Sequence, residues 1–529
     1  MPSRHSLMHI YSALSLLLIG ALLMGCSSEG NTQEQQKAPS ADFDPDIDIA
    51  LTAAPGDIQL RPGQKTEVYN YEANLLKGPQ SALTSLDSYL GPIISVEQGQ
   101  KVRVRFTNQL PRQSIIHWHG LHIPPEMDGH PAYAIEKGQT YTYEFTVTDR
   151  PGTYWFHPHP DKITGLQVYR GLAGMFIIRD TLNSLPGGEY DLPVILQDRL
   201  WDNNNQWVYL EDNQMARMQG FLGDALLVNG KEQSQMEVNR GTYRLRVLNG
   251  SNSRIYKVAW EDGTPVKIIG TDGGLLQSPQ TKPYVMLAPG ERVEIWKDFS
   301  TYAPNTNTQL ISLPFDTGTQ MGMGGNRGMM GRGGNTTARQ APENGSPMDL
   351  VTFQVNDQEG KAKVLPNQLS ELEKIPITEA SNRAAPRTFH FAFEHMQWVI
   401  NGETFEMDEV ADWEKVKLNT TEIWEFTNGT SQGGMGMMGG HMQMPHPVHI
   451  HGLQFQIIER DISEVDPEVW NAVKEGFVDK GWQDTFLLLP GMKVQVIMRF
   501  RDFTGTYIYH CHNLEHEDMG MMRNFEILP

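Results

Sequence analysis

Histidines gather in four short clusters of this chain, and their spacing suits metal binding. Residues i and i+2 of a β-strand point to the same face, so each His-Xaa-His pair presents two imidazoles side by side. A lone histidine is usually a surface or satisfied core residue, but a core would not hold eight polar rings without compensation. Neutral imidazole suits copper, zinc, iron and nickel. Ten of the 17 histidines form the clusters: His117 and His119; His157 and His159; His446, His449 and His451; His510, His512 and His516.

One cysteine narrows the choice of metal. Cys511 stands between the two histidines of the last His-Xaa-His pair, so on a strand its thiol would face away from both imidazoles. The thiolate site can be completed by His446 and His516, with Met521 as a weak axial ligand. Two histidines, one cysteine and a distant methionine are the ligand set of a blue-copper electron-transfer centre. A structural zinc site would normally use more cysteines.

The elements that must position these residues are strands in a repeated unit. Residues 101–106 and 243–247 alternate between apolar and polar side chains, as half-buried strands do. Three related segments end at Asn108, Asn249 and Asn428, a domain-sized spacing. The histidine motifs occur only in the first and last units. We therefore expect an all-β protein of three Greek-key β-sandwiches, in which the outer two carry the chemistry and the middle one spaces them.

Composition and length agree with this organisation. The 529 residues suggest about three domains. The 50 glycines and 32 prolines favour turns and short strands over long helices. The net charge of −20 argues against a nucleic-acid partner. The expected organisation is a signal peptide at 1–25, a tether at 26–44, and domains at 45–182, 183–365 (with a Gly/Met-rich loop at 320–348) and 366–529.

The N-terminus is typical of an export signal. Arg4 precedes an apolar run over 10–24 that is too short for a spanning helix. The run ends at Cys26, in a segment that resembles a bacterial lipoprotein cleavage box; a plain secretory signal is the alternative. The prediction is an exported monomer in the cell envelope, on the periplasmic or outer-surface side. Its only membrane contact would be a lipid on Cys26.

Four motifs, in order, resemble the copper signatures of the multicopper oxidases. They are His-Trp-His-Gly at 117–120, His-Pro-His at 157–159, His-Pro-Val-His-Ile-His-Gly at 446–452, and the segment 510–522 that begins His-Cys-His. The similarity extends to Asp-Gly-Gly-Leu-Leu at 272–276 and is closest to bacterial copper-efflux oxidases and laccases. The resemblance implies three cupredoxin-like domains and four copper ions: one type 1, one type 2 and two type 3.

The resemblance also implies a ligand set for each copper. The type 1 positions are His446, Cys511, His516 and Met521; the type 2 positions are His117 and His449; the type 3 positions are His119, His157, His159, His451, His510 and His512.

The activity implied by the resemblance is oxidation of a substrate by one electron at a time and reduction of dioxygen to water. This reaction consumes protons, and Asp128 and Glu517 resemble the acidic residues that the family uses as proton relays. The alternatives are that Asp128 caps a turn and that Glu517 is solvated. Asp484 is a candidate to orient a ligand histidine, although a hydrogen bond at a strand edge explains it equally well.

Methionine-rich loops point to cuprous ion as the electron donor. Thioether sulfur prefers soft metal ions, so these loops are typical of a cuprous capture surface. The alternative is loose apolar packing of the methionines. The acid-poor loop makes ferrous ion a less attractive substrate. The candidate residues are Met321, Met323, Met329 and Met330 in one loop, and Met435, Met437, Met438, Met442 and Met444 in the other.

Two other functions stay open from the sequence. A laccase-type phenol oxidase would use the same copper sites with methionine loops that bind no metal, and a small reductant would replace cuprous ion. A non-enzymatic copper buffer or electron carrier would need the thiolate site or the methionines, but not eight further clustered histidines. The expected partners are therefore dioxygen and either cuprous ion or a small reductant.

Overall fold

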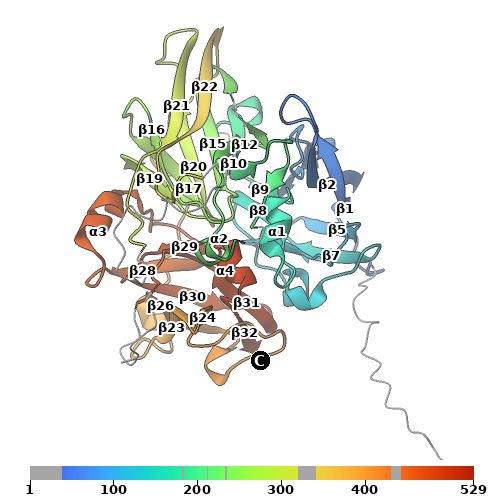
Figure 1. The fold of residues 1–529 in the computed structure, drawn as a ribbon, viewed down its shortest axis with the longest axis vertical. Helices are drawn as coiled ribbons and strands as arrows, with labels where there is room; N and C mark the ends of the chain where they lie inside the picture. Colours follow the sequence, from blue (N-terminus) through green and yellow to red (C-terminus); the bar gives the residue numbers. More distant parts are fainter. Residues whose placement is uncertain (1–38, 181–183, 211–212, 233–234, 320–340, 430–441) are drawn as a thin grey trace, which may run out of the picture. The chain divides into compact units, whose positions relative to one another are not determined.

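In the part of the chain that it describes, the structure, a computed structural model, has β-strands as its main secondary structure and only a few short helices (Figure 1). The predicted signal peptide, Cys26 and most of the methionine-rich loops lie outside the described residues. Within the described part of the chain, no helix is both long and apolar enough to cross a membrane. The described residues are 39–180, 184–210, 213–232, 235–319, 341–429 and 442–529.

The first pair of sheets spans residues 47–179. Its four-stranded sheet, in the order β2-β1-β5-β7, consists of β1 (Ile47–Ile58), β2 (Thr66–Lys77), β5 (Lys101–Asn108) and β7 (Thr140–Thr146). The facing sheet, in the order β3-β4-β9-β8-β6, consists of β3 (Leu83–Thr84), β4 (Ile93–Glu97), β6 (Ile116–His119), β8 (Gly152–Pro158) and β9 (Gly174–Arg179). Apolar side chains of both sheets share one core.

The second pair of sheets spans residues 191–359. The sheet ordered β13-β12-β10-β15-β20-β17-β18, with β11 paired to β10, consists of β10 (Asp191–Trp201), β11 (Trp207–Val208), β12 (Ala225–Val228), β13 (Lys231–Glu232), β15 (Thr242–Asn249), β17 (Val266–Thr271), β18 (Gly274–Lys282) and β20 (Arg292–Asp298). The sheet ordered β14-β22-β21-β16-β19 consists of β14 (Gln235–Arg240), β16 (Tyr256–Trp260), β19 (Val285–Leu287), β21 (Thr306–Ser312) and β22 (Met348–Glu359).

The third pair of sheets spans residues 387–528. The sheet ordered β24-β23-β26-β30-β28 consists of β23 (Arg387–Glu394), β24 (Gln397–Ile400), β26 (Thr420–Asn428), β28 (Phe455–Asp461) and β30 (Lys493–Phe500). The sheet ordered β25-β32-β31-β27-β29 consists of β25 (Lys415–Lys417), β27 (His446–Ile450), β29 (Thr485–Leu488), β31 (Gly505–Cys511) and β32 (Met522–Leu528).

The helices are short and lie between strands. The α-helices are α1 (Thr164–Tyr169), α2 (Gln214–Gln219), α3 (Pro467–Val473) and α4 (Leu514–Asp518). The 3-10 helices are η1 (Gln80–Ala82), η2 (Pro125–Met127), η3 (Pro131–Tyr133), η4 (Gly188–Tyr190), η5 (Ile377–Glu379), η6 (Asp412–Glu414) and η7 (Lys474–Gly476).

The repeated sequence unit corresponds to a repeated strand arrangement. In each domain the first long strand pairs in parallel with a second strand, which pairs antiparallel with a third: β1-β5-β7, β10-β15-β20 and β23-β26-β30. The asparagine that ends the second strand donates its side-chain amide to two carbonyl oxygens: Asn108 to Arg112 and Ile135, Asn249 to Arg254 and Leu287, and Asn428 to Met444 and Leu488.

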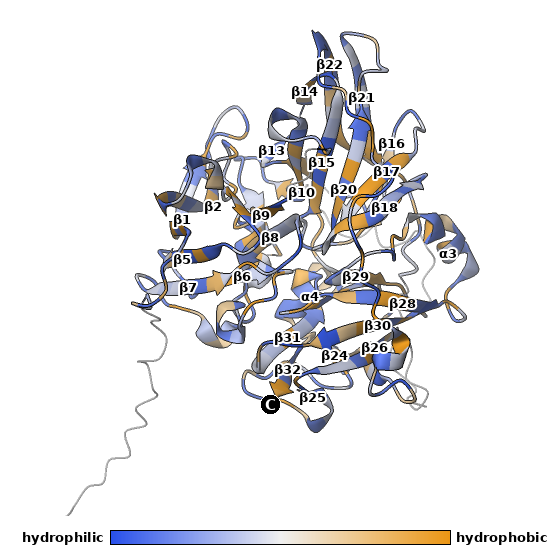
Figure 2. Ribbon diagram, turned by 180° about the vertical axis from the view of Figure 1, so that it is seen from behind, coloured by the Kyte–Doolittle hydropathy of each residue, from blue (hydrophilic) through white to orange (hydrophobic). Residues whose placement is uncertain are grey.

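Burial differs from expectation along β15. Its alternate residues Tyr243, Leu245 and Val247 enter the second core, as the periodicity predicts. The polar residues between them are buried as well: Arg244 and Arg246 both pair with Glu294, which also accepts a hydrogen bond from the first-domain Thr153. Another domain covers the face of β15 that carries these arginines. The alternation of residue types along the strand does not predict this contact. Figure 2 shows the hydrophobic residues along the strands of these sheets.

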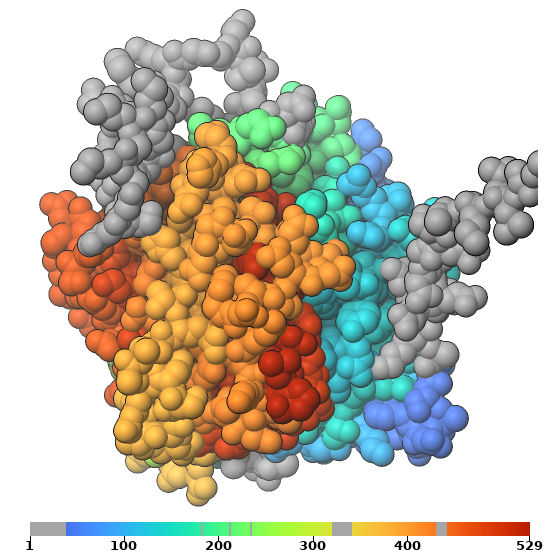
Figure 3. Space-filling model, turned by 90° about the horizontal axis from the view of Figure 1, so that it is seen from below, coloured from blue at the N-terminus to red at the C-terminus, as the bar shows by residue number. Residues whose placement is uncertain are grey.

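The two outer domains are in direct contact. Figure 3 shows residues of the third domain, in orange and red, beside residues of the first domain in cyan. Asp518 of α4 accepts hydrogen bonds from the amides of Thr164 and Gly165 at the start of α1. His122 of the first domain donates to the carbonyl oxygen of Gly452. The clustered histidines lie at this contact.

Candidate metal centre

The four His-Xaa-His motifs stand on the ends of two pairs of antiparallel strands. His117 on β6 lies opposite His157 on β8, and His449 on β27 lies opposite His510 on β31. The second histidine of each motif follows two residues later and therefore shares the face of the first. All eight imidazoles are fully buried, and they face one another across the boundary between the first and third domains.

Ring nitrogens from the two domains converge closely. The Nε2 atoms of His117 and His449 are 3.1 Å apart, and the Nε2 atom of His510 lies 3.3 Å from that of His159. His510 Nε2 also lies 3.1 Å from His451 Nε2. Within the first domain, His119 Nδ1 lies 3.4 Å from His157 Nε2. Nitrogens at such separations can share a bound metal ion.

The neutral charge of the imidazoles and a ring without hydrogen-bond partners are both consistent with metal binding. Burial lowers the pKa of His157 to about 3 and that of His510 to about 4, so these rings are neutral near pH 7, the form that binds a metal. His512 is fully buried, yet neither of its ring nitrogens has a hydrogen-bond partner among the described residues. A buried imidazole without partners is costly, and a metal ion would satisfy it.

A second, smaller centre surrounds the only cysteine in the described residues. Cys511 Sγ lies 3.3 Å from His446 Nδ1 and 3.6 Å from His516 Nδ1, and these two nitrogens are 3.3 Å apart. The side chain of Met521 is fully buried, and its carbonyl oxygen accepts a hydrogen bond from the Cys511 amide. Nitrogen, nitrogen and sulfur form a triangle on one face of β31.

The two centres are connected through three consecutive residues. Cys511 supplies the sulfur of the N₂S triangle, whereas its neighbours His510 and His512 belong to the imidazole cluster. The expected division of one strand into a cysteine face and an imidazole face is therefore present. Only the covalent bonds of residues 510–512 separate the sulfur from the cluster imidazoles.

Two buried carboxyl groups touch different imidazoles of the cluster. Asp128 Oδ2 accepts from His451 Nδ1 at 2.7 Å, and the Asp128 carbonyl oxygen accepts from His117 Nδ1 at 2.7 Å. The carboxyl oxygens of Glu517 lie 3.5 Å from His159 Nε2 and 3.2 Å from His510 Nδ1. Burial raises the pKa of both carboxyl groups well above their usual range. Asp128 also lies in a turn, as the alternative interpretation of this residue expects. Glu517 is buried, which excludes the alternative that it is solvated.

The turn at Asp128 depends on the glycine that follows. Gly129 has φ of +95°, and a Cβ there would overlap the backbone of Ile116 and His117. Glycine thus lets the turn close onto β6 and brings Asp128 to the cluster.

The contacts of Asp484 distinguish between the two roles considered for it, orientation of a histidine and a hydrogen bond at a strand edge. Asp484 Oδ1 accepts from His119 Nε2 at 2.9 Å, and its carbonyl oxygen accepts from His449 Nδ1 at 2.8 Å. Asp484 therefore orients two imidazoles rather than only satisfying a strand edge.

The sequence did not point to α2, which covers the N₂S triangle from the second domain. The carbonyl oxygen of Met218 accepts hydrogen bonds from His516 Nε2 and from Trp398 Nε1, both at 3.0 Å. The contact is made by a backbone atom, so no residue pattern could have predicted it.

Most of the candidate methionines cannot be placed. Met321, Met323, Met329, Met330, Met435, Met437 and Met438 lie outside the described residues. Of the remaining two, Met444 is buried in the third core and Met442 packs against it. Both are close in the chain to His446 of the triangle.

Comparison with known proteins agrees with this geometry. Two family profiles, both described as multicopper oxidase, match residues 67–183 and 379–529. A multicopper oxidase from Staphylococcus epidermidis is 31% identical over 83% of this chain and 82% of its own length. A laccase from Bacillus subtilis is 28% identical over 83% of this chain and 88% of its own length.

Solved structures show the same fold. The crystal structure of the multicopper oxidase McoA from the hyperthermophile Aquifex aeolicus has a TM-score of 0.73 and 32% identity, and the match covers 92% of this chain and 97% of that one. The predicted all-β fold of cupredoxin-like Greek-key sandwiches is confirmed. The chain belongs to the multicopper oxidases, copper-dependent enzymes that oxidise a substrate with dioxygen.

Proposed function

We propose that the chain holds four copper ions in two connected centres and reduces dioxygen to water with electrons from cuprous ion. The observation that carries the proposal is the pairing of an N₂S triangle with eight converging imidazoles through residues 510–512. The proposed type 1 ligands are His446, Cys511, His516 and Met521; the type 2 ligands are His117 and His449; the type 3 ligands are His119, His157, His159, His451, His510 and His512.

Different residues of the proposed site serve electron transfer and proton supply. Bound copper would supply the one-electron steps that side chains do not provide. The His516 ring lies under α2 with its Nδ1 3.6 Å from Cys511 Sγ, and the covalent bonds of residues 510–512 lead from that sulfur to the cluster. A site split in this way keeps the reductant apart from dioxygen.

Asp128 and Glu517 are the proposed proton donors. Each is a buried carboxyl group within hydrogen-bond reach of cluster imidazoles, and burial raises the pKa of each. A carboxyl group with a raised pKa can hold a proton at neutral pH and release it where dioxygen is reduced. Because they contact different imidazoles, the two carboxyl groups would provide two separate proton supplies.

Cuprous ion is the proposed substrate because soft thioether sulfur is frequent in the sequence just before His446, a residue of the N₂S triangle. Met442 and Met444 lie four and two residues before His446, and further methionines precede them in the chain. The burial of Met444 favours a packing role for that residue, so capture would rest mainly on the others. A laccase-type oxidase of phenols is the second candidate, and the similarity to a laccase favours it.

The proposed location is the cell envelope, with a lipid on Cys26 as the only membrane anchor, and the proposed state is a monomer. The apolar run and the cysteine at its end support export. Residues 39–44, at the end of the proposed tether, contact the first domain: Arg103 donates to the carbonyl oxygens of Ser40 and Phe43. The proposed domain ranges are 45–182, 183–365 and 366–529, because each range contains one pair of sheets.

Metal analysis and oxygen uptake together test the proposal. We expect four coppers per chain and four electrons consumed per dioxygen. Steady-state rates on cuprous ion, ferrous ion and a phenol then identify the donor, and cuprous ion should be oxidised fastest. One copper per chain without oxygen uptake would identify an electron carrier and end the oxidase proposal. Four coppers with a preference for phenol would identify a laccase.

A further inference from the structure

The second domain, which carries no clustered histidine, contacts the imidazole cluster directly. The contact is made by the turn between β19 and β20. A Cβ on Gly290 would lie 3.0 Å from His512 Cδ2 and 3.2 Å from His119 Cε1, so only a glycine lets the turn approach both rings without displacing them. Two residues later, β20 begins with Arg292, whose side chain is fully buried. The second domain is therefore more than a spacer.

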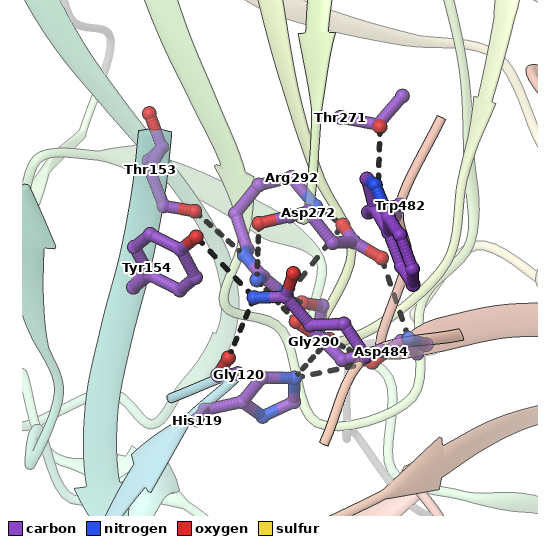
Figure 4. Close-up of polar contacts among 12 residues, drawn as sticks. His119, Gly120, Thr153, Tyr154, Thr271, Asp272, Gly290, Arg292, Trp482 and Asp484 are labelled. Carbon is purple, nitrogen blue, oxygen red and sulfur yellow. Dashed lines mark hydrogen bonds and ion pairs between the residues drawn. The ribbon is translucent and has the colours of Figure 1, made fainter. Parts of the chain in front are cut away.

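All five N–H groups of the Arg292 guanidinium have acceptors, and these acceptors come from three domains (Figure 4). Nε donates to the carbonyl oxygen of Thr153 in the first domain. Nη1 and Nη2 donate to the carbonyl oxygens of Gly290 and Asp272 in the second. The same two nitrogens donate to Asp484 Oδ1 at 2.7 Å and Oδ2 at 2.5 Å in the third.

This ion pair fixes the place of Asp484. A bidentate arginine–carboxylate pair holds the carboxylate plane in one orientation. Asp272 adds a second support, because its carboxylate accepts from the amides of both Arg292 and Thr485. Thr485 Oγ1 donates to Asp484 Oδ1 as well. The carboxylate that meets His119 is thus held in the plane of the guanidinium.

His119 differs from four other cluster imidazoles in the ring nitrogen that faces an oxygen acceptor. Backbone carbonyl oxygens and an ion-paired carboxylate only accept hydrogen bonds, so the ring nitrogen facing one of them carries the hydrogen. At the four rings that face a backbone carbonyl oxygen this nitrogen is Nδ1, which leaves Nε2 for a metal. At His119 the nitrogen facing Asp484 is Nε2, and Nδ1 points to His157. The four rings are those of His117, His157, His449 and His510.

We propose that Arg292 is a positioning residue for the imidazole cluster: by holding Asp484, it selects the His119 tautomer whose Nδ1 carries no hydrogen and could bind a metal. The carbonyl oxygen of Asp484 also accepts from His449 Nδ1, so the same arginine steadies a ring of the proposed type 2 pair. The inference rests on the proposed copper sites. It assigns to the second domain a part in metal binding that its sequence does not reveal.

The test compares R292Q and R292K with the unaltered copper-loaded protein. Mutation of a residue that orients a metal ligand without binding the metal itself typically lowers metal affinity by about 10–100-fold. In R292Q we expect the copper affinity of the imidazole cluster to fall by that factor. Competition with a copper chelator measures this affinity. The blue absorption of the thiolate site should be unchanged. R292K keeps the charge but loses the fork of donors, so its loss should be intermediate.

Arg244 offers a matched control. It is as buried as Arg292, lies on the neighbouring strand β15, and pairs with Asp180 and Glu294 rather than with Asp484. R244Q should lower stability without changing the number or the affinity of the cluster coppers. An equal loss of copper in R244Q and R292Q would overturn the proposal, because general destabilisation would then explain both. Wild-type copper affinity in R292Q would overturn it too.

Two further measurements separate this proposal from the copper chemistry. In the copper-free protein with ¹⁵N-labelled histidine, NMR should show hydrogen on Nε2 of His119, and R292K should shift this ring toward the other tautomer. An unchanged tautomer in R292K would refute the role of Arg292, whether or not the chain is an oxidase. The effects of R292Q and D484N should be non-additive, since one acts through the other; additive losses would contradict that order.

Discussion

Removing the amide of Asn428 should destabilise the third domain and disturb the thiolate site. Asn428 ends β26, is 3% exposed, and donates to the carbonyl oxygens of Met444 at 2.7 Å and Leu488 at 3.2 Å. N428A leaves both carbonyls buried without this donor. Each unsatisfied group costs roughly 1–3 kcal/mol, so unfolding free energy should fall by about 2–6 kcal/mol.

The effect should reach copper because Met444 stands two residues before His446. Releasing the Met444 carbonyl frees the start of β27, which holds His446 opposite Leu488. We therefore expect a weaker or shifted blue absorption and slower oxidation of substrate. Denaturant unfolding of the copper-free protein measures the stability change, and the visible spectrum of the loaded protein measures the change at the thiolate site.

N108A is the matched control, because Asn108 makes the same two contacts in the first domain, with Arg112 and Ile135. It should cost a similar free energy and leave the blue absorption unaltered. The reasoning fails if N428A costs less than about 1 kcal/mol, the lower end expected for even one lost donor. It also fails if N108A changes the blue absorption as much as N428A does.

Three further predictions concern the catalytic parts. C511S should remove the blue colour and all oxidase activity from a folded protein; continued oxygen uptake would show that electrons follow another path. D128N and E517Q should each lower the turnover number about 10²–10⁴-fold, the usual worth of a positioned proton donor, while copper content stays unchanged. Unaltered oxygen uptake in both would exclude proton supply by these residues. Short Gly-Ser linkers in place of 321–330 and 435–441 should abolish cuprous oxidation and spare phenol oxidation; equal loss of both would assign the loops to the fold.

The sequence is sufficient to predict the pairing of the imidazoles and the type of fold. The His-Xaa-His spacing places two imidazoles on one face of a strand in any register, so the pairs follow from backbone geometry alone. The same rule turns Cys511 away from its neighbours. The period-two pattern of residues 243–247 likewise predicts β15 and its core-facing residues. These inferences succeed because each depends on residues a few positions apart.

Contacts between distant segments needed the folded chain. Nothing local indicates that Met218 offers its carbonyl oxygen to His516, or that Arg292 holds Asp484 from another domain. Arg244 looks like a surface residue of a half-buried strand, yet a neighbouring domain covers it. In each case the partner is at least fifty residues away or is a backbone atom. The packing of three domains against one another creates these contacts, and residue types along one strand carry no record of that packing.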